Sequence, residues 1–192
     1  MLTLNFRKAL MLLFFIAPLA QSARYELDNL HTAVHFAVSH FEVSTMRGRF
    51  TSIKGQLEFD QDKGTGSLDL QIDPDTVDTG LRGLDGVLKS AQFFDTKEFP
   101  QARFVSSRFE FDGPRLLAVH GQLTLHGVNQ PVVLQAQRFV CKEVKIIVLR
   151  RNVCGGDFQT KIKRSNFGMR QHLPDVGDEV TLDISVEATP IK

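Results

Sequence analysis

Apolar and polar residues alternate with a period of two along most of the chain after residue 24. Two runs show this clearly. In each run the apolar residues fall on one side of the strand: Val180, Leu182, Ile184, Val186 and Ala188 in the first, and Leu117, Val119, Leu123 and Leu125 in the second. A strand with one buried and one solvated face produces this pattern, which is typical of antiparallel sheets. Turn-forming residues separate the runs about every ten positions, and this spacing predicts an all-β domain of about eight strands.

A single segment, residues 73–100, lacks the alternation. It contains a stretch at residues 81–90 that is compatible with a helix, with Asp78 or Thr79 as candidate N-terminal caps. An all-β chain must protect its sheet edges by closing into a barrel or packing as a sandwich, and the alternation fits both. Because a short helical insert can cover a barrel mouth, we favour an antiparallel up-and-down barrel that is lipocalin-like, with one short helical insert.

Residues 1–22 have the features of a signal peptide. Two basic residues precede an apolar run at residues 9–20, and small residues then lead to a cleavage site after Ser22. The run is shorter than the ~20 residues of a membrane-spanning helix, although an uncleaved anchor is the alternative. We therefore expect a periplasmic or secreted protein with one domain at residues 24–192 and no integral membrane span after signal cleavage.

Charge and aromatic composition exclude some classes of partner. The formal net charge is +1, whereas a nucleic-acid binder normally carries a basic excess, so no nucleic-acid partner is expected. The chain has 16 Phe, one Tyr and no Trp, which disfavours surfaces that stack on sugars or bases.

The two cysteines, Cys141 and Cys154, follow the expected signal peptide. Exported proteins meet conditions in which disulfides persist. The spacing of this pair fits neither a C-x-x-C redox motif nor a zinc site. We predict a structural disulfide between them, with two free thiols as the alternative.

No motif for catalysis or metal binding emerges from the sequence. His31, His35 and His40 lie in an alternating segment, where strand geometry separates them, and His126 shares the polar side of its own strand. Gly-x-Ser-x-Gly elbows and phosphate-binding loops are absent from the sequence. We therefore expect no enzyme activity, no catalytic residue and no metal site.

A cluster of basic residues occurs near the C-terminal third of the chain. Its members are Lys145, Arg150, Arg151, Lys161, Lys163 and Arg164. We interpret it as the solvated surface of a hairpin. Contact with anionic lipid headgroups or with an acidic partner is the alternative.

The order of several short motifs resembles the YceI-like, polyisoprenoid-binding family of exported proteins. The motifs are His31-x-x-Val34-x-Phe36, Phe93-Phe94-Asp95, Gly121-x-Leu123-Thr124-Leu125-His126-Gly127-Val128 and Arg164-x-x-Phe167-Gly168. The sequence departs from the family in Leu84-Asp85-Gly86-Val87-Leu88, where members often carry Arg-Asp-x-His-Leu.

The resemblance implies an extended barrel whose apolar interior holds a long-chain amphiphile, such as an isoprenoid quinone or a polyprenyl lipid, with no other cofactor. The expected function is non-catalytic binding or transport of such a lipid in the bacterial periplasm. The expected lining residues are Val34, Phe36, Leu57, Phe59, Leu70, Phe93, Phe94, Phe104, Leu123, Leu125 and Phe158.

The sequence is compatible with three alternatives, which concern the interior, the function and the oligomeric state. Alternation does not distinguish a lined cavity from a packed core. A second function, an envelope-stress or redox-associated protein with a haem or quinone partner and the barrel as a scaffold, is the alternative to the carrier. A homodimer is compatible with the sequence as well.

Overall fold

The computed structural model describes residues 23–60 and 63–191, so the expected signal peptide at residues 1–22 lies outside it. The strands in the described part are β1 (Ala23–Leu27), β2 (Ala33–His40), β3 (Ser44–Phe50), β4 (Ile53–Asp60), β5 (Thr65–Ile72), β6 (Val77–Asp78), β7 (Ala102–Asp112), β8 (Arg115–Leu125), β9 (Val128–Ile146), β10 (Leu149–Lys163) and β11 (Val176–Pro190). One α-helix, α1 (Arg82–Lys89), and two 3-10 turns, η1 (Pro74–Thr76) and η2 (Arg164–Phe167), complete this part of the chain.

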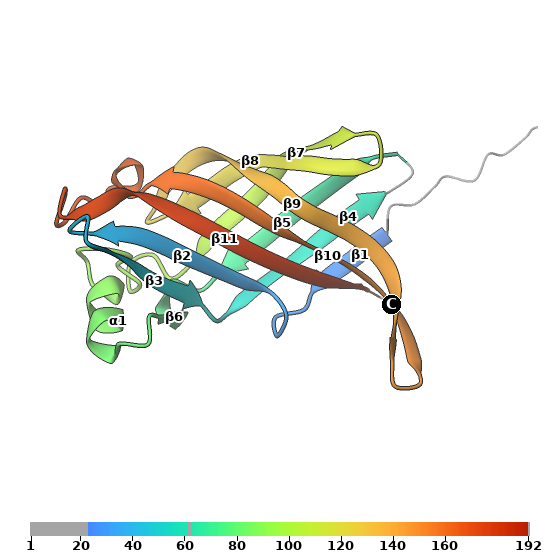
Figure 1. The fold of residues 1–192 in the computed structure, drawn as a ribbon, viewed down its shortest axis with the longest axis horizontal. Helices are drawn as coiled ribbons and strands as arrows, with labels where there is room; N and C mark the ends of the chain where they lie inside the picture. The colour runs from blue at the N-terminus through green and yellow to red at the C-terminus, as the bar shows by residue number, and fades with distance from the viewer. Residues whose placement is uncertain (1–22, 61–62, 192) are drawn as a thin grey trace, which may run out of the picture.

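Eight of these strands form a closed antiparallel barrel (Figure 1). Their order around the barrel is β1-β4-β5-β7-β8-β9-β10-β11, and pairing of β1 with β11 closes the ring. The remaining strands, β2, β3 and β6, continue the sheet from the part of β11 that does not pair with β1. The predicted antiparallel barrel of about eight strands, with one short helix, is confirmed.

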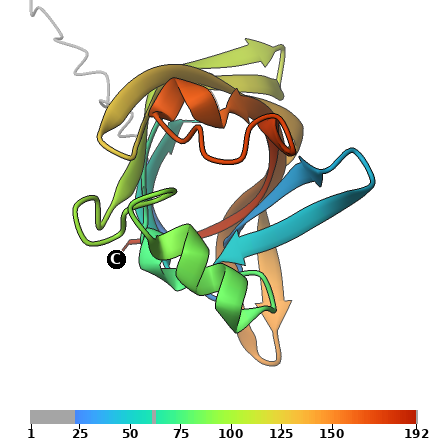
Figure 2. The ribbon, with the colours of Figure 1, turned by 90° about the vertical axis from the view of Figure 1, so that its left-hand side faces the viewer.

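The long strand β11 makes this extension possible. Its C-terminal end pairs with β1, whereas residues 176–185 pair with β2. The barrel is therefore longer on the side of β2 and β3, and α1 lies at this end (Figures 1 and 2). Among the described residues, no helix is long and apolar enough to cross a bilayer.

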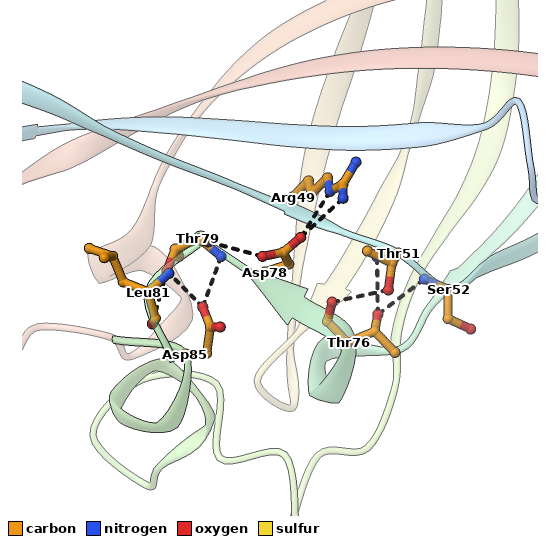
Figure 3. Close-up of polar contacts among 9 residues, drawn as sticks. Arg49, Thr51, Ser52, Thr76, Asp78, Thr79, Leu81 and Asp85 are labelled. Atoms are coloured by element: carbon orange, nitrogen blue, oxygen red, sulfur yellow. Dashed lines mark hydrogen bonds and ion pairs between the residues drawn. The ribbon is translucent and has the colours of Figure 1, made fainter. Parts of the chain in front are cut away.

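Helix α1 confirms the predicted helical segment within one residue at each end. The predicted caps are wrong, because the N-cap residue is Leu81, which makes no side-chain cap hydrogen bond. The Asp85 carboxylate instead accepts hydrogen bonds from the amide and hydroxyl of Thr79, at 2.8 Å and 2.7 Å (Figure 3). A carboxylate in the first turn thus replaces the expected cap and ties the helix to the preceding loop.

Polar contacts also fix the segment before α1 to strand β3 (Figure 3). The Arg49 guanidinium donates to Asp78 at 3.1 Å and 3.2 Å. The Thr76 hydroxyl oxygen accepts from the amides of Thr51 and Ser52. These contacts hold the helical insert against the end of the barrel.

The Cys141–Cys154 disulfide is present, as the sequence predicts. The two residues are direct partners in the β9–β10 pairing, with Cα atoms 4.0 Å apart. Cys154 is fully buried beside the barrel core. The bridge therefore joins β9 to β10 at the residue where the pairing of β10 with β11 begins.

Replacing both cysteines with Ala should lower the free energy of unfolding by about 3 kcal/mol, because the unfolded chain then regains the freedom of a loop of this length. Urea denaturation of the variant and of the oxidised wild type measures the difference. The reduced wild type is the control, since it loses the same constraint without a change of sequence. Equal unfolding midpoints for the variant and the oxidised wild type would contradict the prediction.

Candidate functional site

Two apolar hollows lie inside the barrel. The space between atoms is about 710 Å³ in the first and about 820 Å³ in the second. The part that can hold the centre of a water molecule is only about 60 Å³ and 120 Å³, so both hollows are narrow. Val34, Ile72, Leu123 and Leu182 line both hollows. These four side chains, which we call the waist, therefore lie between two neighbouring hollows of the apolar interior.

The structure places ten of the eleven expected lining residues at these hollows. The first hollow is lined by Val34, Leu57, Leu70, Phe104, Leu123 and Phe158, and the second by Val34, Phe36, Phe93, Phe94, Leu123 and Leu125. Phe59 is the exception. It is buried in the core, where its ring packs against Phe111 and Phe139 at centroid distances of 6.1 Å and 5.1 Å.

Phe59 belongs to an aromatic cluster at the end of the barrel away from α1. The rings of Phe109 and Phe111 stack at 6.5 Å, and Phe139 lies 6.4 Å from Phe158. Phe109, Phe139 and Phe158 also line the first hollow. Rings without polar groups thus bound the apolar interior at this end.

A third hollow lies at the α1 end, and about 330 Å³ of it can hold the centre of a water molecule. It shares with the second hollow the lining residues Phe36, Val38, Leu88, Phe93 and Val176. Its other walls include the exposed side chains Phe41 and Val87. The third hollow therefore lies between the second hollow and the surface, beside α1 and the turn that joins β2 to β3.

Gly121 shows how closely the side chains fill the barrel. It lies on the inward side of β8, as the alternation predicts. A Cβ atom there would collide with the ring of Phe104 and would lie 2.6 Å from the carbonyl oxygen of Val105. Glycine leaves room for a phenylalanine ring that lines the first hollow.

Among the described residues, Arg164 is the one charged residue that lines the two inner hollows. It is only 5% exposed. Its guanidinium donates hydrogen bonds to the carbonyl oxygens of Gly177, Met169 and Val176 at 2.9, 2.9 and 2.8 Å. The same group lies 5.9 Å from the centroid of the Phe93 ring. Backbone oxygens therefore take the place of the water that normally surrounds this cation.

Burial lowers the pKa of Arg164 from its ordinary value, and the charge of Asp178 opposes this shift. Burial alone would raise the pKa of Asp178. Hydrogen bonds from the amide and hydroxyl of Ser165, at 2.9 Å and 2.8 Å, together with the charges of Arg164 and Lys163, outweigh this effect and hold the pKa below its ordinary value. Asp178 thus remains ionised near the buried cation and partly balances its charge.

The structure corrects the interpretation of Arg164 as part of a solvated basic cluster. Lys145, Arg150 and Arg151 lie on the hairpin at one end of the barrel, whereas Arg164 follows β10 at the α1 end (Figure 1). Its inward direction could have been predicted, because Phe158, Ile162 and Arg164 are separated by even numbers of residues. We grouped it by charge instead of by position along the strand.

His126 is a second correction. Its position on the polar side of the alternation predicts a solvent-facing side chain, but the imidazole lies against Phe99 with ring centroids 4.7 Å apart. Its Nδ1 atom is 2.9 Å from the carbonyl oxygen of Phe167. The contact connects the β8–β9 turn to η2, the segment that carries Arg164. Across residues 23–60 and 63–191, no group of three or more His, Cys, Asp or Glu side chains could hold a metal ion.

The described interior gives a ligand few polar contacts. In the described residues, every buried side-chain nitrogen or oxygen already has a hydrogen-bond partner. A molecule in the two inner hollows would therefore be held by apolar contact with aliphatic and aromatic side chains.

Known proteins with similar sequences and folds match nearly the whole described chain. The family model of the YceI-like domain matches residues 25–188. Protein YceI of Escherichia coli O157:H7 is 33% identical over 188 residues, which cover 94% of each chain. The crystal structure of Burkholderia cenocepacia BcnA is 26% identical, with a TM-score of 0.71 over 85% of this chain and 99% of that one.

A more distant solved structure shares the same fold. It is a polyisoprenoid binding domain from Saccharophagus degradans that is implicated in plant cell wall breakdown. It has a TM-score of 0.66 at 18% identity, over 88% of this chain and 99% of that one.

Proposed function

Because this chain belongs to the YceI-like domain family, we propose that it is a non-catalytic carrier for a long-chain isoprenoid or similar amphipathic lipid in the bacterial periplasm. The observation that carries the proposal is the pair of neighbouring apolar hollows that share the waist residues, with a third hollow between the second one and the surface. The Saccharophagus degradans domain of this fold is described as polyisoprenoid binding, which supports the same class of ligand.

The narrow shape of the interior favours a chain over a broad ring system. An extended hydrocarbon chain needs little width, and it buries apolar surface along its whole length at ~25 cal/mol per Å². A haem is a wide, rigid plane. The histidines beside the connected hollows, His40 and His172, line only the outer one. These features support the lipid carrier rather than the haem protein.

Export is part of the proposal, and the disulfide supports it. A disulfide persists in oxidising compartments such as the bacterial periplasm and is rare in the cytosol. The Cys141–Cys154 bridge is therefore suited to a protein that leaves the cytosol and loses residues 1–22 on export.

Organic extraction of the purified protein, followed by mass spectrometry, tests the carrier function. We expect one long-chain lipid per protein chain, carried through purification. Repeated preparations without such a lipid, together with no uptake of added polyprenyl alcohol, would refute the proposal. A Soret band in the visible spectrum would instead support the haem alternative.

A further inference from the structure

The hairpin of β9 and β10 extends beyond the disulfide and projects from the barrel end opposite α1 (Figure 1). Its tip is apolar and exposed: Ile147, Val148 and Leu149 are 87%, 82% and 62% exposed. Ile147 has a φ of 56°, in the left-handed region. That region is unfavourable for a β-branched residue, and tight hairpin turns normally place Gly, Asn or Asp there. The tip thus exposes apolar side chains where neither burial nor turn geometry calls for them.

Cationic side chains surround this tip. We call residues 142–153 the basic hairpin, because it contains Lys142, Lys145, Arg150 and Arg151 against the single carboxylate of Glu143, a net charge of +3. Glu143 pairs with Arg150 at 2.7 Å. The other three cations have no ion-pair partner among the described residues. The whole chain has a formal charge of only +1, so the positive charge is concentrated here.

The basic hairpin is held in a defined orientation. Its strands pair in register from Leu149 opposite Ile146 to Cys154 opposite Cys141. The disulfide closes its base, and the next pairs along β9 and β10 belong to the barrel wall. The apolar tip is therefore presented on a stapled two-stranded arm.

We propose that the basic hairpin docks this protein onto an anionic lipid bilayer. The tip side chains enter the region between headgroups and acyl chains, while the cations of the arm contact lipid phosphates. Three tip residues offer much less area than the ~800 Å² per partner of a stable protein interface, but they suit shallow insertion. This proposal does not depend on which ligand the interior holds.

Docking in this way would orient the barrel. The hairpin and α1 lie at opposite ends of the long axis (Figure 1). The docked protein would therefore hold its α1 end, where the third hollow reaches the surface, away from that bilayer.

Co-sedimentation with phosphatidylcholine vesicles, with and without phosphatidylglycerol, tests the proposal with the oxidised protein. We expect binding only to the anionic vesicles, and weaker binding as salt is raised. Lys142→Gln together with Arg151→Gln should reduce the partition coefficient about 30-fold, since each basic residue near such a surface contributes a several-fold increase. Ile147→Ser with Val148→Ser should reduce it as well, with the melting temperature unchanged because neither side chain is buried.

Matched controls lie at the other end of the molecule. Val43, at the β2–β3 turn, is 86% exposed, so Val43→Ser removes one comparably exposed apolar side chain and matches the single variant Val148→Ser. Arg82→Gln with Arg170→Gln removes two exposed cations. Neither control should alter vesicle binding. Equal binding to neutral and anionic vesicles, or an equal loss in the control variants, would overturn the proposal. So would a dimer in solution that Val148→Ser dissociates, because the tip would then serve a second copy of the chain.

Discussion

Replacing Val34 with Phe is expected to weaken binding of a long polyprenyl chain about 100-fold, because each methylene group kept out of the interior forfeits ~0.8 kcal/mol. Val34 is buried at the waist and lines both inner hollows. A ring at this position would separate the compartment near α1 from the compartment near the aromatic cluster. Titration of lipid-free protein with a fluorescent polyprenyl analogue measures the loss.

The neighbouring residue provides the control for this variant. His35 lies on the opposite, solvent-exposed face of β2, so His35→Phe adds a ring without entering the barrel. If Val34→Phe is overpacked and fails to fold, Leu182→Phe tests the same waist from β11, where the side chain is less tightly enclosed. Wild-type affinity in a folded waist variant would show that the chain does not pass between the two hollows.

Replacing Arg164 with Leu should lower the free energy of unfolding by about 3–5 kcal/mol. The loss arises because the carbonyl oxygen of Met169, in a buried hydrogen bond, and those of Gly177 and Val176, in part-buried ones, would lose the guanidinium as donor. Arg164→Lys should lose less, since it keeps the charge, but one ammonium group cannot reproduce the planar fork of the guanidinium. Urea denaturation measures both differences.

Arg170→Leu is the control for this prediction, because Arg170 lies nearby in sequence but is exposed. Its substitution should change the unfolding free energy by less than about 0.5 kcal/mol. Similar losses for the two arginines would show that the hydrogen bonds to the backbone do not stabilise the α1 end.

Much of the barrel could be predicted from the sequence, because the direction of a side chain in a regular strand depends only on whether its position is odd or even, which we call its parity. The apolar residues of the run from Val180 to Ala188 point inward as expected. Parity fails where a strand contains an extra residue. In β8, Leu116 pairs with Phe111 and Ala118 pairs with Glu110, so Leu117 has no partner. Ala118 is consequently buried, although the alternation places it outside.

Features that depend on long-range pairing could not be read from local patterns. The division of β11 between β1 and β2 joins segments far apart in the chain, and no periodicity encodes it. The link between Asp85 and Thr79 is closer in sequence, but it reverses the usual capping pattern. There, a side chain before the helix accepts hydrogen bonds from the first helical amides, whereas here a helical carboxylate accepts them from Thr79, which precedes the helix.

The candidate site, too, could be predicted from the sequence only in part. Inward parity identifies the aliphatic and aromatic residues of the hollows, but it does not show whether they leave space between them. The space depends on where the rings of Phe104 and Phe36 fall, and these rings occupy room provided by Gly121 and Gly48 on neighbouring strands. Only the assembled barrel shows that two narrow hollows meet at Val34.

Native mass spectrometry of lipid-stripped protein after addition of a polyprenyl alcohol tests the central claim most directly. The proposed carrier predicts a single adduct, one polyprenyl chain per protein, which is absent from the folded Val34→Phe variant and present in His35→Phe. A spectrum in which the folded wild type keeps its bare mass at saturating polyprenyl alcohol would contradict a lipid-binding interior.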